Sequence, residues 1–235
     1  TFKRLFWKVE IMSQGLLFQE PEALKKRFDI DASGYAVKSF DVKQITIRLA
    51  RPMIQDWHYS GSVNGIKTSF CFGLYCNQSL IGAMVYGVPA MANAWKPYAR
   101  NESEVLELRR LACIDRTPKN TESFFIGKTL RWLKHHTEFT VVVSYADAFH
   151  GHSGIIYKAS NFRYLGKTSK SKVILDKDGR TFHDKAIRTT YINRDGKKLF
   201  KPFAKSLKER LLTGEAKYID TPGKHIFVRQ LRNKT

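Results

Sequence analysis

The feature that most constrains the fold is a continuous apolar run, VVVSYA at 141–146, which follows directly on an amphipathic helical pattern. A short apolar run of this kind predicts a strand buried on both faces of a sheet. In the preceding segment, 120–136, apolar residues recur at helical spacing, and Asn120 or Thr121 can cap the start. A helix that leads into a buried strand predicts a crossover between two neighbouring strands of one sheet.

The flanking segments extend this pattern into a mixed α/β order, classed as α/β (α+β), with a central mixed sheet flanked by helices. Two strands joined by a polar turn are predicted at 68–89, and a long strand is predicted at 104–114. The other predicted elements are short helices at 21–28, 52–59, 153–162 and 202–212, and strands at 42–50 and from 163. The expected organisation is a single domain over 1–235, with 168–235 a basic extension packed on it.

The charge of the chain favours a polyanionic partner. Forty-one Lys and Arg residues oppose 21 Asp and Glu residues, which gives a net charge of +20. The part from Lys158 onward holds 21 of the basic residues and only 7 of the acidic ones. Such an excess favours nucleic acid through counterion release. A membrane surface is the competing polyanion, but no basic amphipathic helix with a clean apolar face is evident.

The expected location is the cytoplasm of a bacterial cell. Cys71, Cys76 and Cys113 are an odd number in a long chain, which favours a reducing compartment over a disulfide framework. No apolar run approaches the roughly 20 residues that span a bilayer, and the first residues lack the apolar segment of a signal peptide. The oligomeric state stays open.

Three segments together resemble the Mom family of phage DNA-modification proteins: DWHYSGSV at 56–63, the segment 106–133 and the segment 141–166. The resemblance covers most of the region from about Ile45 to Lys167. It implies a GNAT-like fold, in which two central strands splay apart around a donor. It also implies a transferase that places a carbamoylmethyl (acetamido) group on the exocyclic N6 amine of adenine in double-stranded phage DNA, which protects that DNA from host restriction enzymes.

One segment departs from the usual GNAT pattern. The pyrophosphate loop of GNAT enzymes carries small residues where this chain has Lys119 and Thr121. Small residues allow backbone amides at a helix N-terminus to approach phosphates. An acyl-CoA donor in the usual pose is therefore disfavoured, and an aminoacyl-tRNA is the other candidate donor. Lys119, Asn120, Thr121 and Ser123 are the candidate cofactor-binding residues, with Lys119 able to meet a phosphate as a point charge.

The candidate catalytic residues lie around the end of the buried strand. Asp147 follows this strand, where a carboxylate can accept a hydrogen bond from the adenine amine and act as a base; it can equally cap the following turn. Ser144 and Tyr145 alternate, so only one should face the cleft, and Ser144 is slightly favoured. Tyr157 matches the place where GNAT enzymes often hold a proton donor, although a Tyr there can also simply pack in the core.

A second group of candidates is aromatic and imidazole-bearing. The resemblance raises His58 as a catalytic candidate and Tyr59 and Ser60 as substrate contacts, with Tyr59 or Trp57 able to stack on a flipped base. His150 and His152 are further substrate-binding candidates. A metal held by His58 with His150 or His152 requires that the fold bring them together, since no further ligands lie nearby in sequence. The metal content is left open.

Two arginines and a basic segment complete the candidate set. Arg109 and Arg110 are substrate-binding candidates, and strand alternation sends them to opposite faces, so at most one should point into a groove. The segment 193–218 combines cations with Phe200 and Phe203, which suits a DNA-facing surface or packing against the core.

Two other functions fit the same sequence features. One is a GNAT acyltransferase acting on a protein or small-molecule amine, which predicts the usual CoA loop. The other is a non-catalytic DNA-binding protein, which predicts that loss of Asp147 leaves every activity intact. A nuclease is weaker still, since no acidic pair has metal-binding spacing.

Overall fold

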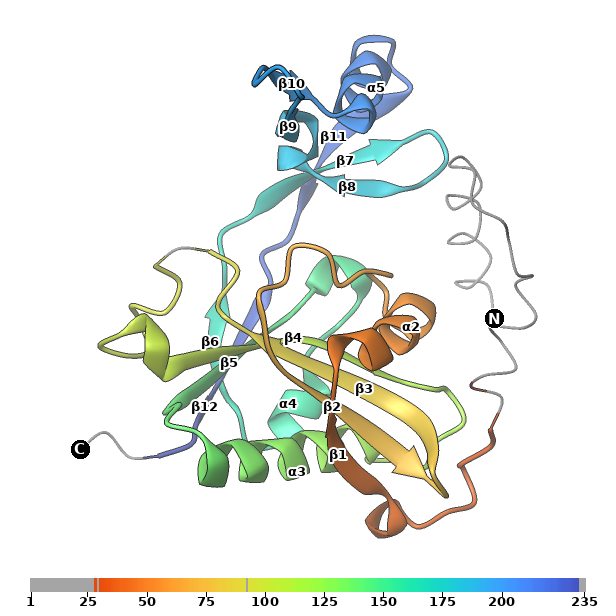
Figure 1. Ribbon diagram of the computed structural model, residues 1–235, viewed down its shortest axis with the longest axis vertical. Coiled ribbons are helices and arrows are strands. Elements are labelled where there is room, and N and C mark those ends of the chain that lie inside the picture. Colours follow the sequence, from red (N-terminus) through yellow and green to blue (C-terminus); the bar gives the residue numbers. More distant parts are fainter. Residues whose placement is uncertain (1–27, 29, 92, 233–235) are drawn as a thin grey trace. The chain divides into compact units, whose positions relative to one another are not determined.

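The computed structural model describes residues 28, 30–91 and 93–232 (Figure 1), so the helix predicted at 21–28 lies outside the described residues except for Phe28. The chain divides into two compact units. Of the described residues, those from 28 to 167 and from 225 to 232 belong to the larger unit, and Thr168–Lys224 form the smaller one. Each unit is described by itself.

The larger unit is built on a mixed sheet with the strand order β1-β2-β3-β4-β5-β12-β6. Every neighbouring pair in this order is antiparallel except β4 and β5, which are parallel. The strands are β1 (Asp41–Ile45), β2 (Thr68–Cys76), β3 (Ser79–Gly87), β4 (Val105–Cys113), β5 (Val141–Ala146), β6 (Arg163–Lys167) and β12 (His225–Gln230). The helices are α2 (Ile47–Trp57), α3 (Thr121–His136) and α4 (Ile155–Ala159), with short 3-10 turns η2 (Val37–Ser39), η3 (Glu102–Glu104) and η4 (Ala148–His150).

The parallel pair splays apart part-way along its length. β4 and β5 are paired from Val105↔Val141 to Leu108↔Ser144. Beyond that point β4 continues beside β3, while the end of β5 continues beside β12. Helix α3 forms the crossover between the two strands. This is the GNAT-like mixed sheet that the sequence predicts, and the splay opens a gap at the carboxyl ends of two central strands.

The β2–β3 hairpin and helix α3 are confirmed. The hairpin turns at Asn77 and Gln78, which both have positive φ, as a tight primed turn requires. Helix α3 spans Thr121–His136, close to the predicted bounds, but its capping differs from the prediction. Asn120 occupies the N-cap position in the left-handed region without a side-chain cap, and the Thr121 hydroxyl donates to the Pro118 carbonyl (2.7 Å).

The segment after residue 41 was predicted wrongly in part. The strand ends at Ile45 instead of running to residue 50, and the helix begins at Ile47 instead of at Pro52. Thr46 caps the helix by accepting a hydrogen bond from the Leu49 amide (3.4 Å). The β-branched run 45–47 favoured a strand, but burial of Ala50, Met53 and Ile54 at helical spacing decides for a helix that contains Pro52.

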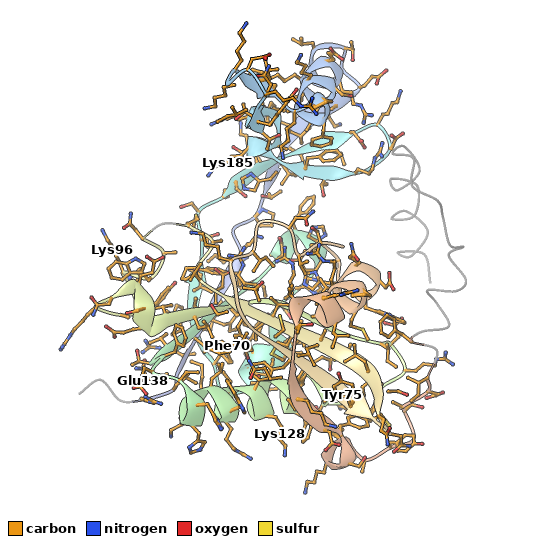
Figure 2. All side chains as sticks on the ribbon, viewed as in Figure 1. Phe70, Tyr75, Lys96, Lys128, Glu138 and Lys185 are labelled. Atoms are coloured by element: carbon orange, nitrogen blue, oxygen red, sulfur yellow. The ribbon has the colours of Figure 1, made fainter. Side chains whose placement is uncertain are left out.

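Aromatic packing and a buried polar pair join α3 to the sheet. Phe70 of β2, labelled in Figure 2, contacts Trp132 of α3 at 5.6 Å between ring centroids. The fully buried Tyr86 of β3 hydrogen-bonds through its hydroxyl to Thr129 of α3 (2.8 Å). The helix that leads into β5 is therefore fixed on the strands that precede it.

The smaller unit has its own sheet and core. Its elements are the sheet β11-β7-β8 (Ala216–Thr221, Ser171–Asp176, Thr181–His183), the hairpin β9 (Thr190–Ile192) and β10 (Lys198–Phe200), the 3-10 helix η5 (Asp184–Arg188) and helix α5 (Pro202–Leu212). Helix α5 has the predicted bounds, with proline in its first turn. Ile174, Leu207 and Ala216 form the buried core. In sequence, this unit lies between β6 and β12, since residues 225–230 belong to the larger sheet.

Asp176 ties the smaller unit together. Its buried carboxylate accepts the backbone amides of Asp178 (3.0 Å) and Arg180 (2.8 Å), and it also pairs with the guanidinium groups of Arg180 (3.0 Å) and Arg210 (3.1 Å). One side chain thus joins β7, the following turn and α5.

We expect Asp176→Asn to lower the free energy of unfolding of the smaller unit by about 2–3 kcal/mol, because an amide cannot accept all four hydrogen bonds and loses the charge. Urea unfolding of the full chain measures this change. Asp220→Asn, on the exposed part of β11, is the control and should change stability by less than about 0.5 kcal/mol. Equal effects of the two changes would contradict the role assigned to Asp176.

Candidate active site

A pocket of about 340 Å³ lies where β4 and β5 splay apart. Its walls come from the end of α2, the second half of β4, the end of β5 and the turn that leads into α4. The lining residues are Trp57, His58, Tyr59, Leu108, Arg109, Arg110, Leu111, Tyr145, Ala146, Asp147, Gly151, His152, Ser153, Gly154, Ile155, Ile156 and Tyr157. Ligand sites in open α/β sheets lie at the carboxyl ends of strands in this way.

Tyr59 lies at the centre of a ring cluster. Its ring contacts His58 (4.3 Å between centroids), His150 (4.6 Å) and His152 (4.9 Å). Residues from the end of α2 and from the turn after β5 are thereby brought together. Tyr59 itself lines the pocket.

The Tyr59 hydroxyl is held in its neutral form. Burial, followed by the negative charge of Asp147, raises its pKa to about 12, although Arg110 acts in the opposite direction. At neutral pH, Tyr59 is therefore a hydrogen-bond donor and not a phenolate.

His58 is held in one tautomer by Ser60. The Ser60 backbone amide donates to His58 Nδ1 (3.1 Å), and the Ser60 hydroxyl lies 2.8 Å from the same nitrogen. Since Nδ1 accepts the amide hydrogen, the neutral ring carries its proton on Nε2. Of the candidates in the DWHYSGSV segment, His58 and Tyr59 line the pocket, and Ser60 orients His58 from behind it.

Asp147 both lines the pocket and caps the turn that follows β5. Its carboxylate accepts the Phe149 amide (3.1 Å), and its backbone carbonyl accepts the amides of His150 and His152 (3.1 Å each). The two interpretations of Asp147 from sequence, a cleft carboxylate and a turn cap, are therefore compatible. The cap holds the carboxylate at the carboxyl end of β5.

Tyr157 and Ser144 interact behind the pocket wall. Tyr157 lines the pocket although only 8% of its surface is exposed. Ser144 is fully buried and donates from Oγ to the Leu108 carbonyl (3.1 Å). Burial raises the pKa of Tyr157, and the neighbouring Ser144 hydroxyl acts against this shift. Tyr157 is thus a protonated phenol that lies beside Ser144.

The structure places Tyr145, and not Ser144, in the pocket wall. On β5, Val142, Ser144 and Ala146 alternate with Val141, Val143 and Tyr145. Sequence reasoning left this choice open with a slight preference for Ser144. Strand alternation shows which residues of β5 share a face. It does not show which face lines the pocket, because that depends on where β4 and β5 separate.

Arg109 and Arg110 both line the pocket but are anchored differently. Arg109 pairs with the buried Glu107 (3.4 Å) and donates to the Val88 carbonyl (3.3 Å). Arg110 donates from Nε to the Ser62 carbonyl (2.9 Å), and burial lowers its pKa. Glu107 was missed from the sequence; its signal is the i, i+2 spacing to Arg109 on one face of a strand.

The candidate cofactor-binding residues lie apart from the pocket lining. Thr121 is fully buried, and Ser123 donates from its hydroxyl to the Asn120 carbonyl (3.0 Å). Lys119 and Asn120 are exposed. None of the four lines the described pocket.

The fold does bring His58, His150 and His152 around one ring, as a shared metal would require. Yet within residues 28, 30–91 and 93–232 no group of His, Cys, Asp or Glu side chains has the arrangement of a metal site. The ring of Tyr59 occupies the centre of the three histidines instead.

The mixed sheet with its splayed β4–β5 pair and the pocket at the splay define a GNAT-like fold. The model of the Mom protein family matches residues 39–232, and the chain belongs to this family. The methylcarbamoylase Mom of Escherichia phage Mu is 30% identical over 171 residues, which cover 70% of this chain and 68% of that protein.

Solved acetyltransferases are also similar to this chain, at low identity. The ribosomal-protein-S18-alanine N-acetyltransferase of Escherichia coli has a TM-score of 0.45 and 10% identity, covering 83% of this chain and 96% of that chain. An N-acetyltransferase of Staphylococcus aureus has a TM-score of 0.41 and 9% identity, covering 83% and 99%. No helix in the described part of the chain is both long and apolar enough to cross a membrane.

Proposed function

We propose that this chain is a DNA-modifying transferase that adds a carbamoylmethyl group to the exocyclic N6 amine of adenine in phage DNA and so protects it from host restriction enzymes. The observation that carries the proposal is the pocket at the β4–β5 splay, where Asp147, Tyr157 and Tyr59 converge in a member of the Mom family. The phage Mu relative is a methylcarbamoylase by name, which supports transfer of a group of this composition.

The chemistry of the amine explains what such a pocket must provide. The N6 lone pair is delocalised into the adenine ring, so the amine is a weak nucleophile. As its bond to the carbamoylmethyl carbon forms, N6 loses a proton, and the bond from that carbon to the leaving group of the donor breaks. The base must also leave the stack of the duplex to reach a recessed site.

The pocket residues suit these requirements. Asp147 is the proposed acceptor for the amine hydrogen, since its carboxylate is held at the strand end by the turn that it caps. Tyr157 is the proposed proton donor to the leaving group, with Ser144 as its positioning residue. His58, with its proton on Nε2, and the Tyr59 hydroxyl are proposed donors to ring nitrogens of the base.

Charge and composition support DNA as the substrate and the bacterial cytoplasm as the place of action. The net charge of +20 favours a polyanion. Arg109, Arg110, His150 and His152 are proposed to contact the DNA or its flipped base. Transfer of a carbamoylmethyl group requires a donor whose leaving group is carried on the methylene carbon, whereas an acyl-CoA or an aminoacyl-tRNA reacts at its carbonyl carbon and would acylate N6. Any of these donors would meet the first turn of α3 at Lys119, Asn120, Thr121 and Ser123.

The test is mass spectrometry of nucleosides from the DNA of bacteria that express the chain. We expect a deoxyadenosine heavier by one carbamoylmethyl group, and at least a tenfold smaller yield with Asp147→Ala, because the amine loses its proton acceptor. Asp220→Ala, at an exposed position of β11 in the smaller unit, is the control for expression and charge.

An unmodified nucleoside pool from cells with folded protein would contradict the proposed function. The same extract would then be tested for acylated protein and small-molecule amines, which is the result that a conventional GNAT acyltransferase predicts. Full modification by the Asp147→Ala variant would remove Asp147 from the proposed mechanism.

A further inference from the structure

The β9–β10 hairpin of the smaller unit is exposed on both of its faces. Its strands pair only with each other in the described structure, at Lys198↔Ile192, Leu199↔Tyr191 and Phe200↔Thr190. Directly opposed residues share a face, so Ile192 and Phe200 lie on one face and Tyr191 and Leu199 on the other. An isolated two-stranded ribbon is marginal in water.

The apolar exposure of this ribbon is large for a surface hairpin. Ile192 is 73% exposed, Tyr191 43%, Phe200 39% and Leu199 38%. Single exposed apolar residues are ordinary, whereas this ribbon exposes two on each of its faces.

The chemistry of the partner follows from the charges on the same ribbon. Arg194, Lys197, Lys198 and Lys201 lie along 190–201 against the single acid Asp195. Within the described residues, none of these four cations pairs with a carboxylate, while Asp195 is held in the turn by Asn193 (3.1 Å). Lys208 of α5 adds a further cation, over the ring of Phe200 at 3.6 Å.

Three acidic residues elsewhere in this unit pair with arginine or lysine. Asp176 pairs with Arg180 and Arg210, Asp178 pairs with Arg180, and Glu215 pairs with Lys177 (3.2 Å). Figure 2 draws these side chains, with Lys185 labelled. Within the ribbon itself, 190–201, Asp195 is the single acidic residue.

We infer that the β9–β10 ribbon is a docking element for duplex DNA, separate from the modification pocket. A two-stranded ribbon fits the roughly 12 Å width of the major groove, where its edges reach the phosphates on either side and the apolar residues of one face, such as Ile192 and Phe200, meet base edges. This inference rests on the proposed function for its substrate, DNA, but it assigns the ribbon residues independently of the pocket.

The test measures binding of a short fluorescein-labelled DNA duplex to the full chain by anisotropy, over a series of salt concentrations. The variant R194Q/K197Q/K198Q is compared with K172Q/K185Q/K217Q, which removes the same charge from exposed positions on β7, η5 and β11. We expect the ribbon variant to bind at least about tenfold more weakly than the control, and its salt slope to fall by about two to three. A third variant, Ile192→Ser, should weaken binding with the salt slope unchanged.

Equal losses in the ribbon and control variants would overturn the inference, because net charge alone would then explain binding. The ribbon variant is also tested with deacylated tRNA and with phosphatidylserine vesicles. If it loses binding to one of these but binds the DNA duplex unchanged, the inference is overturned. Thermal melts of each variant exclude unfolding as the cause. If adenine is modified in cells but the ribbon variant binds the duplex as tightly as the unchanged chain, the docking role of the ribbon is refuted and the proposed function stands. If the ribbon variant loses duplex binding but no modified adenine is found in cells, the proposed function is refuted and the docking role of the ribbon stands.

Discussion

Tyr157→Phe is expected to lower the rate of adenine modification by about 10²–10⁴-fold while leaving the protein folded. The change keeps the ring that packs against Phe162 and Phe227 and removes only the hydroxyl. That hydroxyl is protonated at neutral pH because burial raises its pKa, and Ser144 lies beside it. Proton transfer to the leaving group would then depend on water.

The measurement is the yield of modified deoxyadenosine per unit of protein over a time course. Tyr164→Phe is the matched control, because Tyr164 also packs against the ring of Phe227 (5.3 Å) but hydrogen-bonds His225 outside the pocket (3.0 Å). The control should keep activity within about threefold. A purely structural Tyr157 would give both variants the same activity, with any difference confined to their unfolding free energies.

The positioning role proposed for Ser144 is tested by the modification rate of a Ser144 variant in the same assay. Ser144→Ala should lower the rate less than Tyr157→Phe, since the phenol remains but is less well oriented. Combined with Tyr157→Phe it should add little, because the two residues act as one unit. Additive losses would place Ser144 in contact with the substrate instead.

The fold could be predicted from sequence because its strongest signals are local. The apolar run of β5, the amphipathic pattern of α3 and the polar turn at Asn77 each specify one element, and their order specifies the crossover. The failure at β1 and α2 has a local cause as well. Ile45, Thr46 and Ile47 favour a strand by propensity, and only burial of one helical face against the sheet decides otherwise.

The site was less accessible to sequence reasoning because it depends on contacts between distant segments. His58 and Tyr59 end α2, while His150 and His152 follow β5, and their packing about one ring is a tertiary result. The pairing of Arg109 with Glu107 and the exchange of roles between Ser144 and Tyr145 likewise depend on where the parallel strands separate. Residue types indicated the chemistry, but not which side chains would be brought together.

Two glycines in the wall of the pocket show how closely the site depends on the core behind it. Gly151 and Gly154 both line the pocket and both have positive φ, +77° and +76°. A Cβ added at Gly151 would meet nothing within 4 Å. A Cβ added at Gly154 would lie 2.2 Å from the ring of Phe227, which is fully buried and cannot move aside without displacing Tyr157.

We therefore expect Gly154→Ala to lower the free energy of unfolding of the larger unit by about 3–5 kcal/mol. About 1–2 kcal/mol comes from the left-handed backbone, and the rest comes from overpacking against Phe227. Gly151→Ala should lose only the backbone contribution, so the difference between the two variants isolates the steric cost. Denaturant unfolding of both variants measures this difference. Equal losses would mean that α4 shifts away from β12 to accommodate a methyl group, and Tyr157 would then lose the fixed position on which its proposed role as proton donor depends.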